Sequence, residues 1–121
     1  METKKYLVIQ DHTTDYPEPI SFAKGALLTV GERYDGPEGW EDWFFCETPG
    51  QKGGWVPAQI IEFVKDKTAI SLEDYTAREL NARKGEVLIG TKTINGWVWC
   101  KSNDSLESGW IPLANLQETY Q

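Results

Sequence analysis

Short stretches in which apolar and polar residues alternate recur along the chain, and each stretch is bounded by glycine or other turn-forming residues. Alternation with a period of two is typical of β-strands, whereas a helix would need apolar positions three and four residues apart, and that pattern is weak here. The pattern therefore predicts an all-β chain. The expected strands are Tyr6–Ile9, Ala26–Val30, Trp43–Glu47, Gly54–Val56, Ile60–Phe63, Ala69–Leu72, Val87–Lys92, Gly96–Lys101, Gly109–Ile111 and Asn115–Gln117.

Three short sequence markers occur twice, in the same order and at offsets of 54 to 60 positions. Such self-similarity indicates an internal repeat, and the unequal offsets indicate loops of different length. The marker pairs are Lys24-Gly25 with Lys84-Gly85, Trp43–Cys46 with Trp97–Cys100, and Gly54–Pro57 with Gly109–Pro112.

The repeat predicts two small domains, a first copy at residues 5–64 and a second copy at residues 69–118, each with five strands. Between them lies a linker at residues 65–68 that contains neither glycine nor proline. At ~3.5 Å per residue, four residues span only about 14 Å. We therefore expect a monomer in which the two copies lie close together and in contact.

Alternation along the strands also assigns side chains to faces. Val98 and Cys100 are expected in the core, which places Trp97 and Trp99 on the outer face. In the first copy the same logic pairs Phe44 with Cys46 inside, and Trp43 with Phe45 outside. Exposed aromatic side chains often mark a binding surface. The alternative for Phe45 and Trp99 is that they cover the rim of their own domain or the other copy.

The negative net charge of the chain excludes some classes of binding partner. The 121 residues contain 12 Lys+Arg and 19 Asp+Glu, a net charge of −7. An acidic chain repels nucleic acid and anionic lipid, so neither is expected as a partner. No apolar run reaches the ~18 residues of a membrane helix, and the start of the chain does not resemble a signal peptide. We therefore expect a cytoplasmic protein.

Few residues are suited to catalysis or metal binding. The chain has two cysteines, Cys46 and Cys100, and one histidine, His12, which are too few for a four-ligand zinc site. Two buried free thiols are a simpler interpretation than a Cys–His nucleophile pair. None of the common nucleotide-binding, hydrolase or metalloprotease motifs is present. We expect no enzyme activity, no metal and no cofactor.

Several motifs of the second copy follow one another in a familiar order. They are Asp74-Tyr75, Lys84-Gly85-Glu86, Gly96-Trp97 and Gly109-Trp110-Ile111-Pro112, and the first copy carries shorter versions of them. In this order they resemble the Src homology 3 (SH3) family, variant SH3 type, in tandem. The resemblance implies two five-stranded antiparallel barrels, each with a short 3-10 turn after the proline. It also implies binding of Pro-rich peptides in an aromatic groove.

The resemblance further places groove positions on this sequence. In the first copy they are Gln10, His12, Trp43, Pro57 and Ile60; in the second copy they are Glu73, Tyr75, Trp97, Pro112 and Asn115. The family usually has tyrosine where Gln10, His12, Ile60, Glu73 and Asn115 stand. Each groove therefore keeps its tryptophan and proline but lacks most tyrosines. This departure weakens the expectation of ordinary Pro-rich recognition.

Acidic residues gather in the first copy, where residues 1–64 hold 5 Lys+Arg and 11 Asp+Glu. A pocket for a basic ligand segment is one hypothesis, because a carboxylate beside an aromatic slot can hold an arginine or lysine. A solvated surface that aids solubility is the alternative. The residues assigned to such a pocket are Asp15, Glu18, Trp40, Asp42 and Trp43.

The loop that follows His12 has the usual length of the family's RT loop, whereas the one after Tyr75 is short, with four residues before Leu80. The main functional hypothesis is a non-catalytic protein-interaction module that binds a basic or Pro-rich segment. The alternative is that the two domains have a structural role and that their grooves are vestigial. The missing tyrosines favour this alternative. A cell-wall-binding module is disfavoured, because the chain shows no export signal and no hydrolase domain.

Overall fold

A computed structural model describes residues 3–14, 18–34, 42–103 and 106–119. The described residues form strands and two short 3-10 turns, with no α-helix among them. The elements are β1 (Lys4–Val8), β2 (Ser21–Phe22), β3 (Leu27–Arg33), β4 (Trp43–Glu47), β5 (Gly54–Pro57), η1 (Ala58–Ile60), β6 (Ile61–Lys65), β7 (Thr68–Ser71), β8 (Tyr75–Thr76), β9 (Val87–Ile94), β10 (Trp97–Ser102), β11 (Ser108–Pro112), η2 (Leu113–Asn115) and β12 (Leu116–Thr119).

The prediction of an all-β chain is confirmed, and each of the ten expected strands is present with its ends shifted by a few residues. The structure adds two very short strands, β2 and β8, which pair with each other. Each 3-10 turn directly follows a proline, Pro57 before η1 and Pro112 before η2, as the family resemblance implied.

The strands divide between two compact units, and each unit contains one five-stranded antiparallel sheet. The continuous unit is Glu18–Arg78, whose sheet has the strand order β5-β4-β3-β7-β6. The split unit combines Met1–Pro17 with Glu79–Gln121, and its sheet has the order β11-β10-β9-β1-β12. This division differs from the expected one, because both units contain residues from both sequence copies.

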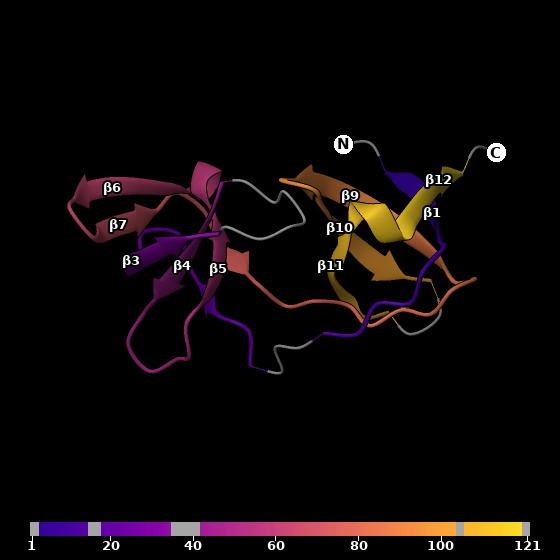
Figure 1. The fold of residues 1–121 in the computed structure, drawn as a ribbon, viewed down its shortest axis with the longest axis horizontal. Coiled ribbons are helices and arrows are strands. Elements are labelled where there is room, and N and C mark those ends of the chain that lie inside the picture. Colours follow the sequence, from indigo (N-terminus) through magenta and orange to yellow (C-terminus); the bar gives the residue numbers. More distant parts are fainter. Residues whose placement is uncertain (1–2, 15–17, 35–41, 104–105, 120–121) are drawn as a thin grey trace. The chain divides into compact units, whose positions relative to one another are not determined.

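Strands β1 and β7 account for the difference. β1 belongs to the first copy, yet it pairs with β9 and β12 of the second copy. β7 belongs to the second copy, yet it pairs with β3 and β6 of the first. Figure 1 shows this exchange by colour, since the indigo strand β1 lies among the orange and yellow strands of the split unit. Each five-stranded sheet thus receives its first strand from the other copy.

The short connection at residues 65–68 explains why the strands exchange. These residues form the turn of a hairpin between β6 and β7, in which Lys65 pairs with Thr68. Closing a tight turn costs much less chain entropy than joining segments that are far apart in sequence. The segment expected as a linker is therefore part of the continuous unit, and β7 occupies the position that β1 would otherwise take.

The exchanged strands make the same contacts in both units. The carboxylate of Asp11 accepts a hydrogen bond from the backbone N–H of Lys84, at 2.6 Å. The carboxylate of Asp74 likewise accepts from the backbone N–H of Lys24, at 2.8 Å. In each case the aspartate of one sequence copy accepts a hydrogen bond from the Lys-Gly turn of the other copy. The repeated sequence thus allows either strand to fit either position.

The core of the split unit is built around β1 and β10. The buried apolar residues of this core are Tyr6, Val8, Leu80, Ala82, Leu88, Val98, Cys100, Ile111 and Leu116. A two-residue turn, Asn95-Gly96, joins β9 to β10. Both turn residues have positive φ, 47° and 85°, as a type I′ hairpin turn requires. This local turn sets the register as far as Trp99, and a bulge then shifts the pairing so that Cys100 stands opposite Gly90.

Gly90 on β9 lies directly beneath the Tyr6 ring, and a Cβ there would lie 2.5 Å from Tyr6 Cε2 and 2.8 Å from Val98 Cγ1. We expect Gly90→Ala to lower the free energy of unfolding by about 1–3 kcal/mol, because the close-packed core cannot absorb an added methyl group. Urea unfolding followed by circular dichroism measures the change. In the Tyr6→Leu background the same substitution should cost less, because only the contact with Val98 remains; an equal cost in both backgrounds would show that the Tyr6 ring is not an obstacle.

Candidate functional site

The strand exchange sorts the expected groove residues into two new sets. The split unit contains Gln10, His12, Trp97, Pro112 and Asn115. The continuous unit contains Glu18, Asp42, Trp43, Pro57, Ile60, Glu73 and Tyr75. Asp15 and Trp40 lie outside the described residues. Neither expected groove is therefore assembled from one copy; each unit combines groove residues of both copies.

In the split unit, His12 lies between a carboxylate and an indole. His12 Nε2 is 2.7 Å from Glu79 Oε1, and both side chains are largely buried. The His12 ring meets the Trp97 ring edge-on, with 5.7 Å between centroids. Trp97 is half-buried and stands opposite Pro112 in the β10–β11 ladder, and Pro112 itself is buried. An acid, an imidazole, an indole and a proline are thus brought together in one unit.

Backbone hydrogen bonds hold this cluster in place. His12 and Ala82 exchange both backbone hydrogen bonds, at 2.8 and 2.9 Å. Glu79 forms an isolated bridge with Trp110 on β11. Asn115 is buried, and its amide donates to the carbonyls of Gln10 and Asp11, at 3.3 and 3.1 Å. Asn115 therefore fastens the segment after β1 to η2, whereas the tyrosine usual at this position in the family would present a ring.

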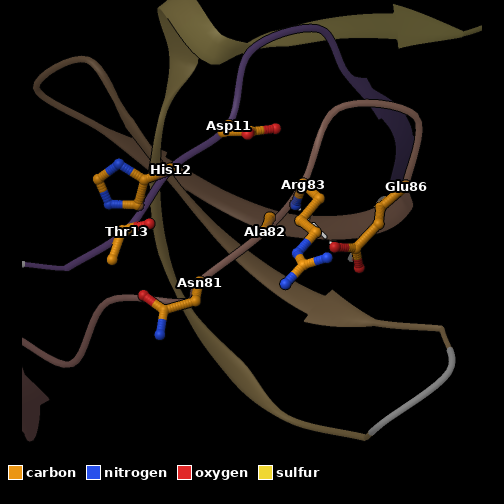
Figure 2. Close-up of a pocket in the computed structure, with 7 residues that line it drawn as sticks. All are labelled: Asp11, His12, Thr13, Asn81, Ala82, Arg83 and Glu86. Atoms are coloured by element: carbon orange, nitrogen blue, oxygen red, sulfur yellow. Dashed lines mark hydrogen bonds between the residues drawn. The ribbon is translucent and has the colours of Figure 1, made fainter.

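A polar hollow of about 520 Å³ adjoins His12. Figure 2 shows its residues on two segments that face each other, with Asp11, His12 and Thr13 on one and Asn81, Ala82, Arg83 and Glu86 on the other. Both carboxylates bond to the backbone: Asp11 accepts from the Lys84 N–H and Glu86 from the Arg83 N–H, at 2.7 Å. These two carboxylates therefore stabilise the turn at residues 83–86. The hollow lies on one side of the His12 cluster.

In the continuous unit, Trp43 is only 6% exposed. The expectation that the Trp43 indole is displayed on the surface is therefore wrong, although the register keeps Trp43 on the face opposite to Val56 and Cys46. Burying an indole removes a large apolar area from water, so an indole is stabilised when it is covered on either face of a sheet. Trp43 still stands opposite Pro57, but Pro57 and Ile60 are buried as well.

On β10 the face assignment is confirmed. Val98 and Cys100 are buried, while Trp97 and Trp99 are half-buried. Trp99 packs edge-on against Trp110, with 5.3 Å between ring centroids, and Phe45 packs likewise on Trp55, at 5.4 Å. These contacts support the alternative that Trp99 and Phe45 cover their own sheets. Trp97 is thus the outer-face indole of β10 that meets the His12 ring.

Tyr75 contributes a second aromatic surface, in the continuous unit. Its hydroxyl donates to the Trp55 carbonyl at 3.0 Å, and its ring lies 5.6 Å from that of Phe22. An open hollow of about 540 Å³ lies beside these rings. It is lined by Ser21, Phe22, Ala23, Asp74, Tyr75 and Thr76. Phe22 comes from the first copy, so the exchange also builds this surface from both copies.

Two acidic residues assigned to a pocket for a basic ligand, Glu18 and Asp42, are paired with cations of their own unit. Glu18 lies 2.8 Å from Lys52 Nζ, and Asp42 lies 3.0 Å from the Arg33 guanidinium. The hydrogen bond and the charge of Glu18 raise the pKa of Lys52. Glu73 is exposed. Glu79, which the sequence pattern did not indicate, is the carboxylate that bonds to His12 beside Trp97.

Both cysteines are buried free thiols, as expected. Burial raises the pKa of Cys46 to about 11 and that of Cys100 to about 12, because the thiolate would lose its hydration. Neutral thiols are poor nucleophiles. The two cysteines therefore serve the core rather than a reaction.

Residues 5–64 match the variant SH3 domain family. The chain contains a variant SH3 domain. Its SH3 fold is repeated, since both five-stranded antiparallel sheets carry the same 3-10 turn after a proline. SH3 domains are protein-interaction modules, typically without catalytic activity.

Two relatives extend the similarity to the second copy. The chain is 28% identical to SH3 and PX domain-containing protein 2B of Mus musculus and equally to that of Homo sapiens, over 134 aligned residues. The alignments cover 98% of this chain but only 14% of each relative. No solved structure matches the chain significantly. Within the described ranges, no helix is long and apolar enough to cross a membrane.

Proposed function

We propose that this chain is a non-catalytic interaction module that binds a basic or Pro-rich peptide segment beside Trp97. The supporting observation is the His12–Glu79–Trp97 cluster, in which a half-buried indole stands opposite Pro112 and a carboxylate lies close by. Polyproline II segments are already extended, so they lose little entropy when their rings enter an aromatic slot. A carboxylate next to the slot suits an arginine or lysine of the peptide.

The continuous unit offers a second, more open surface around Tyr75 and Phe22. Its Trp43 is buried, so an indole contributes little to this surface. We assign the main site to Trp97 and a weaker one to Tyr75. The relatives' printed name includes SH3, which supports peptide binding, while the remainder of those proteins lies outside the similarity.

Trp97→Ala tests the assignment. We expect it to weaken binding of a synthetic ten-residue peptide of proline and leucine with one terminal arginine by about 10-fold or more, since central indoles dominate such interfaces. Titrations followed by the indole N–H signals in two-dimensional NMR measure the affinity and show which indole responds.

Trp99→Ala is the matched control, because Trp99 lies on the same face of β10 but packs on Trp110. It should keep the wild-type affinity. Equal loss in both variants, or a peptide response confined to the indoles of the continuous unit, would contradict a site at Trp97.

A structural pair with vestigial grooves is the second candidate. Two observations favour it: the burial of Trp43, and the amide of Asn115, which is bonded to the protein's own carbonyls. It predicts no saturable indole shift with any Pro-rich or basic peptide. For either candidate we propose a cytoplasmic monomer that binds neither nucleic acid nor membranes, consistent with its net charge of −7.

A further inference from the structure

The two exchanged strands are held in their sheets in different ways. β7 is joined to its neighbour β6 by the turn at Asp66 and Lys67, so it forms a local hairpin. β1 has no such connection, because its neighbours β9 and β12 lie far along the chain and Lys5 pairs with Thr119. Closing the longer loop costs more chain entropy. The segment 3–14, which contains β1, is therefore the more weakly tethered of the two.

The contacts that hold this segment in its unit come from residues 79–119. Besides the two strand ladders, the Val8 N–H donates to the Glu86 carbonyl and the Ile9 N–H to the Asn115 carbonyl. The Lys84 N–H, the Asn115 amide and Glu79 bond to residues 10–12. Detachment of the segment would break these contacts together and would withdraw Tyr6 and Val8 from the core, so docking of the segment is coupled to folding of the split unit.

The same segment supplies one side of the proposed site. His12 belongs to it, whereas Trp97, Glu79 and Pro112 belong to the other part of the split unit. Without segment 3–14, Trp97 would lose the ring that stands against it, and Glu79 would lose its partner. The surface at Tyr75 has no such dependence, because Phe22 and Tyr75 lie in the continuous unit.

We propose that docking of segment 3–14 switches the Trp97 site on and off, so that a bound peptide and the docked segment stabilise each other. This inference rests on the proposed function and adds its regulation. Linkage requires the effect to be reciprocal: a ligand that binds only the docked form favours docking, and fixing the segment raises the affinity for the ligand.

A cross-link between β1 and β12 tests the switch. Leu7 and Gln117 are Cα partners in the ladder. Such partners lie about 4.5–5.5 Å apart, within the range that a disulfide bridges. The double variant Leu7→Cys/Gln117→Cys therefore locks the segment when oxidised. The matched control is Glu62→Cys/Ile70→Cys, which cross-links the equivalent positions of β6 and β7.

Amide hydrogen exchange gives a readout that needs no peptide. The N–H groups of Val8 and Ile9 correspond to those of Ser71 and Leu72, which donate to Ala26 and Ile60 in the continuous unit. We expect Val8 and Ile9 to exchange at least 10-fold faster than Ser71 and Leu72. The 7–117 cross-link should remove this difference, and the 62–70 cross-link should leave it. Equal exchange in the protein without cross-links would overturn the switch.

The second measurement repeats the amide exchange with the synthetic Pro-Leu peptide that carries a terminal arginine. At saturation the peptide should slow the exchange of Val8 and Ile9 about 10-fold, and the locked variant should bind it several-fold more tightly than the reduced one. Normal binding at Trp97 without slower exchange would overturn the switch alone. No binding even to the locked variant would overturn the proposed function, and the switch with it, whatever the exchange rates show.

Discussion

Replacing Val8 with aspartate should lower the free energy of unfolding of the split unit by about 4 kcal/mol or more. Val8 is fully buried on β1, in the core cluster that includes Leu88 and Ile111. A carboxylate at this position would lose its hydration among mostly apolar side chains, and the core cluster contains no cation to pair with it. Urea unfolding followed by tryptophan fluorescence and circular dichroism measures the effect.

The strand exchange makes this prediction specific. In a chain whose copies each folded on their own residues, Val8→Asp would damage the unit that contains Trp43; here it should unfold the unit that contains Trp97, while amide signals of residues 18–78 stay dispersed. Lys5→Asp is the control, since Lys5 is exposed on the same strand, and it should change stability by less than about 1 kcal/mol. Loss of dispersion in residues 18–78 would contradict the exchanged arrangement.

Alkaline pH should destabilise the protein through its two buried thiols. In the unfolded chain the thiols ionise near their ordinary pKa of 9.0, whereas in the folded chain burial raises the pKa of Cys46 to about 11 and that of Cys100 to about 12. Above pH 9 the unfolded state therefore releases protons that the folded state keeps. The contribution of the two neutral thiols to the free energy of unfolding is fully present below pH 9 and is lost as the pH rises toward 11 and 12.

At about pH 10.5 the two thiols together should lower the free energy of unfolding by roughly 4 kcal/mol relative to pH 8. Urea unfolding at both pH values measures the loss. The double variant Cys46→Ala/Cys100→Ala controls for tyrosines and lysines, which also ionise in this range, and it should lose roughly 4 kcal/mol less. The same pH dependence in wild type and variant would show that the thiols do not cause it.

The strands and the inward positions of β10 were predictable because they follow from residues close in sequence. The alternation of Trp97 to Cys100 and the Asn95-Gly96 turn act locally, so a single sequence contains their signal. The burial of Trp43 was not predictable, because alternation assigns a face and says nothing of what covers that face. Local pattern thus predicts which residues form strands more securely than whether each large aromatic side chain is exposed.

The strand exchange could not be read from alternation, since β1 and β7 carry the same pattern and make equivalent contacts. The short connection at residues 65–68 suits a link between domains as well as a hairpin turn, and its length alone does not distinguish the two. For the same reason Glu79 was missed: it lies 67 positions from His12, and only the exchange brings the two side chains together. A weak signal was the shortness of the loop after Tyr75, which leaves little chain for a hairpin within the second copy.

The pairing of Lys5 with Thr119 has a topological consequence. A few added residues joining β12 to β1 would turn the chain into a closed ring, in which both units have the same connectivity. Opening that ring at the Asp66-Lys67 turn would give a circular permutant that begins with β7 and ends with β6. In that permutant the two units would trade roles, and the unit containing Trp43 would be the one assembled from both ends of the polypeptide.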